Sequence, residues 1–135
     1  MPIGLGIGLN ISMRGGLGGG LSLTAPDAAW ISDAATAQAV FEIDVDGTAL
    51  DTDTVYGEAY TDAGLTSLFD TDEELVDTSD FIISTFAFDP FTPDGTYYVR
   101  FCIRRGGIQI SPWSDVISME IDTSTYAGTY YYLGF

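Results

Sequence analysis

The chain has 135 residues, and its 20 acidic side chains face only four basic ones, which gives a net charge of −16 at pH 7. The basic residues are all arginines, and lysine and histidine are absent. This charge argues against nucleic acid and anionic lipid as partners, because their phosphates need a basic surface. Without histidine, the usual proton-transfer side chain near neutral pH is missing, so we expect no enzymatic activity and no cofactor.

Hydropathy predicts no membrane insertion. No stretch approaches the roughly 18 continuous apolar residues of a membrane span. The first residues also lack the basic and compact apolar regions of a signal peptide, so we expect synthesis in the cytoplasm. The single cysteine, Cys102, lies in a predicted strand and cannot form an intrachain disulfide, so we interpret it as a small buried hydrophobe.

Residues 1–24 form a glycine-rich, carboxylate-free arm in which large apolar side chains stand at odd positions. A lone strand cannot hide one apolar face from water, and the intervening glycines let another backbone approach closely. We therefore predict that the arm is an assembly interface that pairs with neighbouring chains. Its apolar residues are Ile3, Leu5, Ile7, Leu9, Ile11, Met13, Leu17, Leu21 and Leu23.

Residues 25–122 carry all the carboxylates and alternate with the period of two that is typical of half-buried strands. Strands are predicted over residues 39–46, 53–62, 80–88, 95–105 and 114–122, and residues 65–77 are either a long loop or an edge strand. The inward-facing residues of the two clearest strands are Ala39, Phe41, Ile43 and Val45, then Tyr97, Val99, Phe101 and Ile103. Gly106 and Gly107 should end the longest strand in a hairpin. Five or more such strands predict an all-β, antiparallel β-sandwich.

The segment 91–121 resembles the end of a fibronectin type III repeat, which is an immunoglobulin-like sandwich. The residues that carry the resemblance are Phe91, Pro93, Thr96, Tyr97, Val99 and Phe101, followed by Ser111, Pro112, Trp113 and Ser114. The resemblance implies structural roles for Pro93, Tyr97 and Trp113. It makes Tyr97 the tyrosine corner, whose hydroxyl bonds to the backbone a few residues upstream.

Residues 123–135 form a third region, an aromatic tail that carries no charged side chain. We predict that its rings are buried against neighbouring subunits. They belong to Tyr126, Tyr130, Tyr131, Tyr132 and Phe135.

Two clusters of carboxylates are candidates for chemistry. Asp44, Asp46, Asp51 and Asp53 surround Gly47 and could hold Ca²⁺, although the spacing fails the EF-hand pattern and aspartates also cap turns without a metal. The run Asp70, Asp72, Glu73 and Glu74 could be a glycosidase pair, but a solvated acidic segment is the favoured interpretation.

Arg104 and Arg105 form the one doublet of positive charge. They could bind a neighbour's carboxylate, but pairing with the protein's own excess acid is slightly favoured.

An apolar arm, a small acidic sandwich and the lack of catalytic equipment together resemble the organisation of small tailed-bacteriophage proteins with immunoglobulin-like domains. That resemblance implies a structural protein of the virion, in a head decoration, tail or fibre, which contacts other virion proteins and forms a homo-oligomer. The alternative is a carbohydrate-binding or host-adhesion module that binds a host-surface glycan. Tyr56, Tyr98 and Trp113 would then contact the sugar.

Overall fold

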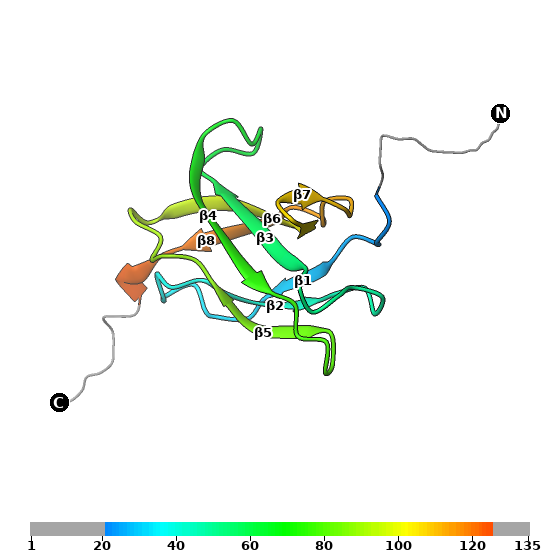
Figure 1. Ribbon diagram of the computed structural model, residues 1–135. Coiled ribbons are helices and arrows are strands. Elements are labelled where there is room, and N and C mark those ends of the chain that lie inside the picture. Colours follow the sequence, from blue (N-terminus) through cyan, green and yellow to red (C-terminus); the bar gives the residue numbers. More distant parts are fainter. Residues whose placement is uncertain (1–20, 126–135) are drawn as a thin grey trace.

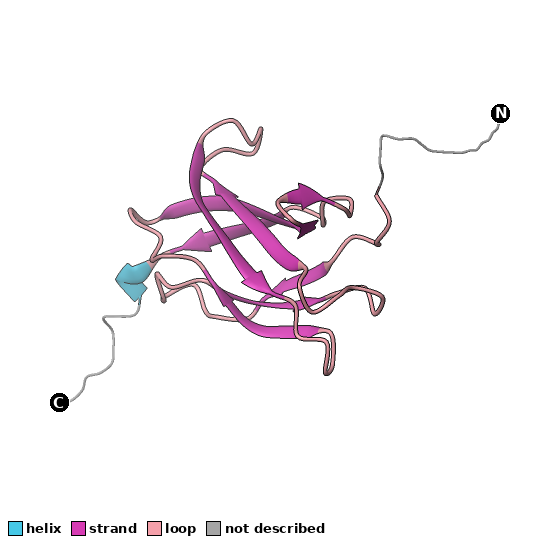
Figure 2. Cartoon of the chain, viewed as in Figure 1, coloured by secondary structure: helices cyan, strands magenta, loops and turns pink. Residues whose placement is uncertain are grey.

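The computed structural model describes residues 21–125, which form a sandwich of two antiparallel sheets (Figures 1 and 2). The three-stranded sheet has the order β1-β2-β5, and the five-stranded sheet has the order β4-β3-β6-β7, with β8 paired to β6. The predicted all-β sandwich is therefore confirmed. The strands are β1 (Asp27–Trp30), β2 (Val40–Asp44), β3 (Thr54–Tyr60), β4 (Leu68–Leu75), β5 (Ile82–Ala87), β6 (Gly95–Arg105), β7 (Ile108–Gln109) and β8 (Ile117–Ile121), followed by the 3-10 turn η1 (Thr123–Thr125).

The two strands with the clearest alternation, β2 and β6, form the centre of the sandwich. All eight residues predicted to face inward are buried. Cys102 is buried as well, although it belongs to the opposite face of β6. The hairpin after β6 turns at Gly106 and Gly107, whose φ angles of +60° and +81° are of the kind that glycine adopts readily.

The core is built around phenylalanine side chains from both sheets. Phe41, Phe86, Phe88 and Phe101 are each at most 1% exposed. Their rings meet edge-on, with centroids 5.1 Å apart for Phe41 and Phe101 and 5.2 Å apart for Phe86 and Phe101. These are the distances at which aromatic edges and faces attract each other.

Gly57 lies in the middle of β3 because these rings leave no room for a side chain. A Cβ atom at this position would lie 2.8 Å from atoms of both Phe88 and Phe101. The glycine therefore allows the rings to pack directly against the backbone of β3.

The segment 65–77, for which the sequence left two alternatives, contains an edge strand. Its strand β4 pairs with β3 over seven residue pairs, with an irregularity between Ala59 and Tyr60. Strand β1 was not predicted. It pairs with β2 through four residues, two of them alanines, and so lacks an alternating pattern.

The hydroxyl of Tyr97 donates a hydrogen bond to the carbonyl of Pro93, as the fibronectin resemblance implies. The Tyr97 ring is 3% exposed and packs against Phe91, with centroids 4.7 Å apart. The ring thus joins the loop before β6 to the core.

Leu23 corrects one prediction for the arm. It was assigned to the assembly interface, but it is buried in the core of its own domain, and its N–H donates to the Ile110 carbonyl. Leu21 is 59% exposed and remains available to a partner. The other predicted interface residues lie outside the described part: Ile3, Leu5, Ile7, Leu9, Ile11, Met13, Leu17, Tyr126, Tyr130, Tyr131, Tyr132 and Phe135.

The first and last described residues lie at opposite ends of the sandwich (Figure 1). Within residues 21–125, no helix is long and apolar enough to cross a membrane.

Candidate functional site

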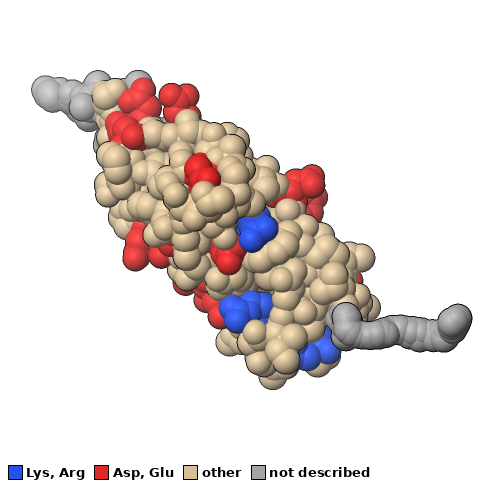
Figure 3. Space-filling view, turned by 90° about the horizontal axis from the view of Figure 1, so that it is seen from above, with Lys and Arg blue, Asp and Glu red and all other residues tan. Residues whose placement is uncertain are grey.

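The outer face of the five-stranded sheet gathers aromatic and arginine side chains. Alternate residues of β6 face away from the core, and these include Tyr98, Arg100 and Arg104. Tyr56 projects from β3 on the same face, and Trp113 comes from the segment between β7 and β8. In Figure 3 the arginine surface appears as separate patches within largely uncharged surface, with carboxylates beside some of them.

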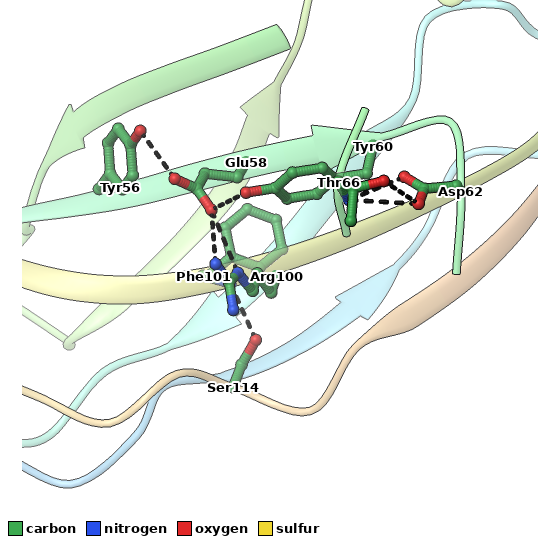
Figure 4. Close-up of polar contacts among 8 residues, drawn as sticks. All are labelled: Tyr56, Glu58, Tyr60, Asp62, Thr66, Arg100, Phe101 and Ser114. Carbon is green, nitrogen blue, oxygen red and sulfur yellow. Dashed lines mark hydrogen bonds and ion pairs between the residues drawn. The ribbon is translucent and has the colours of Figure 1, made fainter. Parts of the chain in front are cut away.

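Glu58 is the polar centre of this face (Figure 4). Its Oε1 atom accepts hydrogen bonds from Arg100 Nε at 3.1 Å, Arg100 Nη2 at 3.0 Å and the Tyr60 hydroxyl at 2.6 Å. Its Oε2 atom accepts one from the Tyr56 hydroxyl at 3.1 Å. Burial raises the pKa of Glu58, but these donors outweigh burial and hold its pKa below the ordinary value. The same carboxylate thus fixes two tyrosines and one arginine.

The rings and guanidinium groups are stacked in a column. Arg100 Cζ lies 3.8 Å from the ring centroid of Trp113 and 5.7 Å from the ring centroid of Tyr60. The ring centroids of Trp113 and Tyr56 are 6.2 Å apart, and Arg104 Cζ lies 4.3 Å from the ring centroid of Tyr56. Such cation–π contacts are favourable when they are partly shielded from water. We call these five residues the aromatic–arginine column.

Two buried serines hold Trp113 in place. The Ser111 hydroxyl accepts from the Ile103 N–H at 2.8 Å, and the Ser114 hydroxyl accepts from the Phe101 N–H at 2.9 Å (Figure 4). These hydroxyl oxygens accept the hydrogen bonds that the carbonyls of a neighbouring strand would otherwise accept from the N–H groups of β6. The Ser-Pro-Trp-Ser segment therefore follows β6 closely and turns Trp113 over the sheet.

The column changes how the predicted glycan contacts are interpreted. A sugar stacks on the open face of an aromatic ring, but the protein's own guanidinium groups lie over Trp113 and Tyr56. All three predicted residues lie on one face of the sheet, each half-buried. The structure thus places all three on one face, with Tyr56 and Trp113 in ring contact and each covered by an arginine of the protein itself.

Beneath the column, Cys102 is 1% exposed, and burial raises the pKa of its thiol to about 12. A thiol with this pKa is protonated at neutral pH and is a poor nucleophile or metal ligand. Its interpretation as a buried hydrophobe is confirmed.

The four aspartates of the calcium candidate do not converge. Asp53 is fully buried and accepts from Arg105 Nε at 2.7 Å, Arg105 Nη2 at 2.8 Å and the Leu50 N–H at 2.8 Å. Asp46 instead bonds Thr24 and Thr48, and their hydrogen bonds hold its pKa well below the ordinary value. Asp44 and Asp51 are exposed. In the described part of the chain, no group of three or more acidic, histidine or cysteine side chains is placed to hold a metal.

The second carboxylate cluster lies along β4. Asp70 accepts from the N–H of Thr71 and of Asp89, and Asp72 accepts from the N–H of Glu73. Glu74 accepts from the N–H of Ala87, although burial raises its pKa. Asp70, Asp72 and Glu74 are thus bound to backbone groups, and the neighbouring Asp72 carboxylate also raises the pKa of Glu74.

Both residues of the arginine doublet pair within the domain, as the favoured interpretation predicted. Arg105 binds the buried Asp53, and Arg104 Nη1 lies 3.7 Å from Glu73 Oε1. Glu58 and Arg100 were not predicted as site residues from the sequence. Their signal was weak, namely opposite charges at outward positions of two neighbouring strands.

Comparison with known proteins adds a likeness of fold. No family model and no curated protein matches the chain. Among solved structures, 70% of the chain is similar to part of PhoD, with a TM-score of 0.54 and 17% identity. The chain spans 18% of the length of that PhoD chain. The likeness shows that this arrangement of strands occurs elsewhere.

Proposed function

We propose that the chain is a non-enzymatic structural protein of a bacteriophage particle, anchored by its N-terminal arm and displaying the sandwich outward. The observation that carries the proposal is that the described chain begins and ends at opposite ends of the sandwich (Figure 1). The arm and the aromatic tail are therefore attached at opposite ends, where each can contact a different neighbour.

The charge distribution supports this role. The sandwich carries every carboxylate of the chain, whereas residues 1–20 carry one arginine and no acid. Like-charged domains repel each other, so contacts between subunits are made more easily by the two extensions, which carry no acidic side chain. This division suits a protein that is fixed by its ends and exposed in between.

A fibronectin-like sandwich is part of the proposal. It is supported by the two antiparallel sheets and by the Tyr97 hydroxyl bond to Pro93. The non-enzymatic role is supported by what the candidate groups do in the structure. Asp53, Glu58 and Glu74 are each engaged by donors within the domain.

The test is the protein content of particles made by the phage that encodes the chain. We expect the chain to co-purify with intact particles through a density gradient, at a constant ratio to the major shell protein. If the chain remains entirely in the unassembled fraction, the proposal is wrong. Binding of the isolated sandwich to a glycan array, lost on Tyr98→Ala, would instead favour the adhesion module.

A further inference from the structure

The sandwich has two sides at which edge strands lie, and these sides differ in how the backbone N–H groups of the edge strands are bonded. One side is formed by the outer edges of β4 and β5, where backbone N–H groups are bonded by carboxylates. Asp70 Oδ1 accepts from Thr71 N at 2.9 Å, Asp72 Oδ1 from Glu73 N at 2.8 Å and Asp80 Oδ1 from Ile82 N at 3.1 Å.

Asp70 and one further carboxylate, Glu74, reach from β4 to the last residue of β5 and the segment just beyond it. Asp70 Oδ2 accepts from Asp89 N at 3.2 Å, and Glu74 accepts from the N–H of Ala87. An edge whose N–H groups are already bonded, and which is lined by negative charge, resists the addition of another strand. This side of the sandwich is therefore closed.

The opposite side is formed by the outer edges of β1 and β8. Among residues 21–125, β1 pairs with β2 alone and β8 pairs with β6 alone, so each has one row of backbone groups without a strand partner there. Among the described residues, no carboxylate accepts a hydrogen bond from a backbone N–H within either strand. The two segments are tied together beyond the strands, where the Asp122 N–H donates to the Ala34 carbonyl at 2.8 Å.

This side also exposes apolar side chains. Ala28, Trp30 and Ile117 pack against the core but are only partly buried. Near them in sequence, Ile31 is 53% exposed and Val116 is 47% exposed. A strand added here could cover apolar surface and pair its backbone at the same time.

The arm is joined to the domain on this same side. The Leu23 N–H donates to the Ile110 carbonyl, which lies in the segment between β7 and β8. Residues 3–13 alternate large apolar and small side chains over a length that exceeds the five residues of β8. They contain no carboxylate, so they can approach a domain that carries twenty.

We propose that residues 3–13 of one copy add as a strand to the outer edge of β8 in a second copy. The odd-numbered apolar side chains then cover Ala28, Trp30 and Ile117, and the glycines between them lie on the outer face. This inference rests on the proposed role of the arm in assembly. It names the partner as a second copy of this chain and the contact as the β8 edge.

The test is disulfide crosslinking between two differently tagged full-length chains, one with Gly8→Cys and the other with Ser118→Cys. Ser118 is exposed on the outer face of β8, where we place Gly8. The native Cys102 stays in place because its thiol is buried, and a mixture without added cysteines serves as the blank. Gly6→Cys is tested in parallel to allow for a shift in register.

After mild oxidation, we expect a covalent dimer of the two tagged chains when the second cysteine is at position 118. We expect its loss when that cysteine is placed on the closed side instead, by Thr71→Cys, an exposed residue of β4. Circular dichroism and melting of each variant show whether it is folded.

Three results overturn the inference. They are the absence of a mixed dimer with Ser118→Cys, equal dimer with Thr71→Cys, and crosslinking only when both cysteines are in the same chain, which would mean that the arm pairs with its own domain. Particles that contain the chain without this crosslink would reject the β8 contact and leave the proposed function standing. Absence of the chain from particles would reject the proposed function, whatever the crosslink shows.

Discussion

Gly57 offers a direct test of how the sheet beneath the candidate site is packed. A Cβ atom added there would lie 2.8 Å from Phe88 Cζ and 2.8 Å from Phe101 Cε1, and both rings are at most 1% exposed. Overpacking of this kind costs about 1–3 kcal/mol, whereas replacing a strand glycine by alanine gains up to about 1 kcal/mol. We therefore expect Gly57→Ala to lower the free energy of unfolding by about 1–2 kcal/mol.

The assay is urea unfolding followed by tryptophan fluorescence. With a slope of roughly 1.5 kcal/mol per molar urea, the midpoint should fall by about 1 M. Gly47→Ala is the matched control, because nothing lies within 4 Å of a Cβ at that position, and it should leave the midpoint unchanged or raise it slightly. Phe88→Leu added to Gly57→Ala should cost less than the sum of the two single changes, because one of the two rings that clash with the new Cβ is gone. A Gly57→Ala variant as stable as the parent would refute the packing argument.

Three further predictions concern single groups. Tyr97→Phe should cost about 1–2 kcal/mol in thermal unfolding because the Pro93 carbonyl loses its donor, and an unchanged melting temperature would count against the tyrosine corner. Arg105 holds the pKa of Asp53 below its ordinary value of 3.8, so Asp53 stabilises the fold fully above that pH and loses this effect as pH falls through the lower folded-state pKa. Asp53→Asn should therefore lower stability at pH 7 and flatten its decline below about pH 4, and equal slopes for both proteins would contradict the ion pair. Cys102, with a thiol pKa of about 12, should react with a thiol reagent at pH 8 only on unfolding, so rapid labelling of the native protein would contradict its burial.

The strands that the sequence predicts well are those whose own residues carry the pattern. In β2 and β6, large apolar residues alternate with polar ones, because one face of each strand packs on the core and the other does not. Strand β4 is ambiguous because its acidic run resembles a solvated loop. Its carboxylates accept hydrogen bonds from backbone N–H groups, two of them within β4 and one at Asp89 just beyond β5, and this use becomes visible only in the folded sandwich.

The candidate site is less predictable because it depends on neighbours that are distant in the chain. Trp113 and Tyr56 are recognisable as candidate binding rings, but the guanidinium groups over them come from β6. The pairing of β3 with β6 brings Arg104 to Tyr56, and the bond of Ser114 to β6 brings Trp113 to Arg100. Asp53 lies two residues before the buried Val55 at the start of β3 and shares its inward direction, whereas Asp51 is exposed. The sequence therefore grouped a buried ion-paired carboxylate with exposed ones.

The most direct test of the account is the number of copies of the chain per particle when the apolar face of the arm is made polar. Ile7→Asp with Leu9→Asp should leave the sandwich folded but remove the chain from purified particles, because each buried charge would lack a partner and cost several kcal/mol. Leu68→Asp, on an exposed residue of β4, is the control and should be incorporated normally. Quantitative mass spectrometry of gradient-purified particles gives the copy number of the parent chain, the arm variant and the Leu68→Asp control. Loss of the arm variant alone is the predicted result, and normal occupancy of that variant would contradict the arm as the anchor.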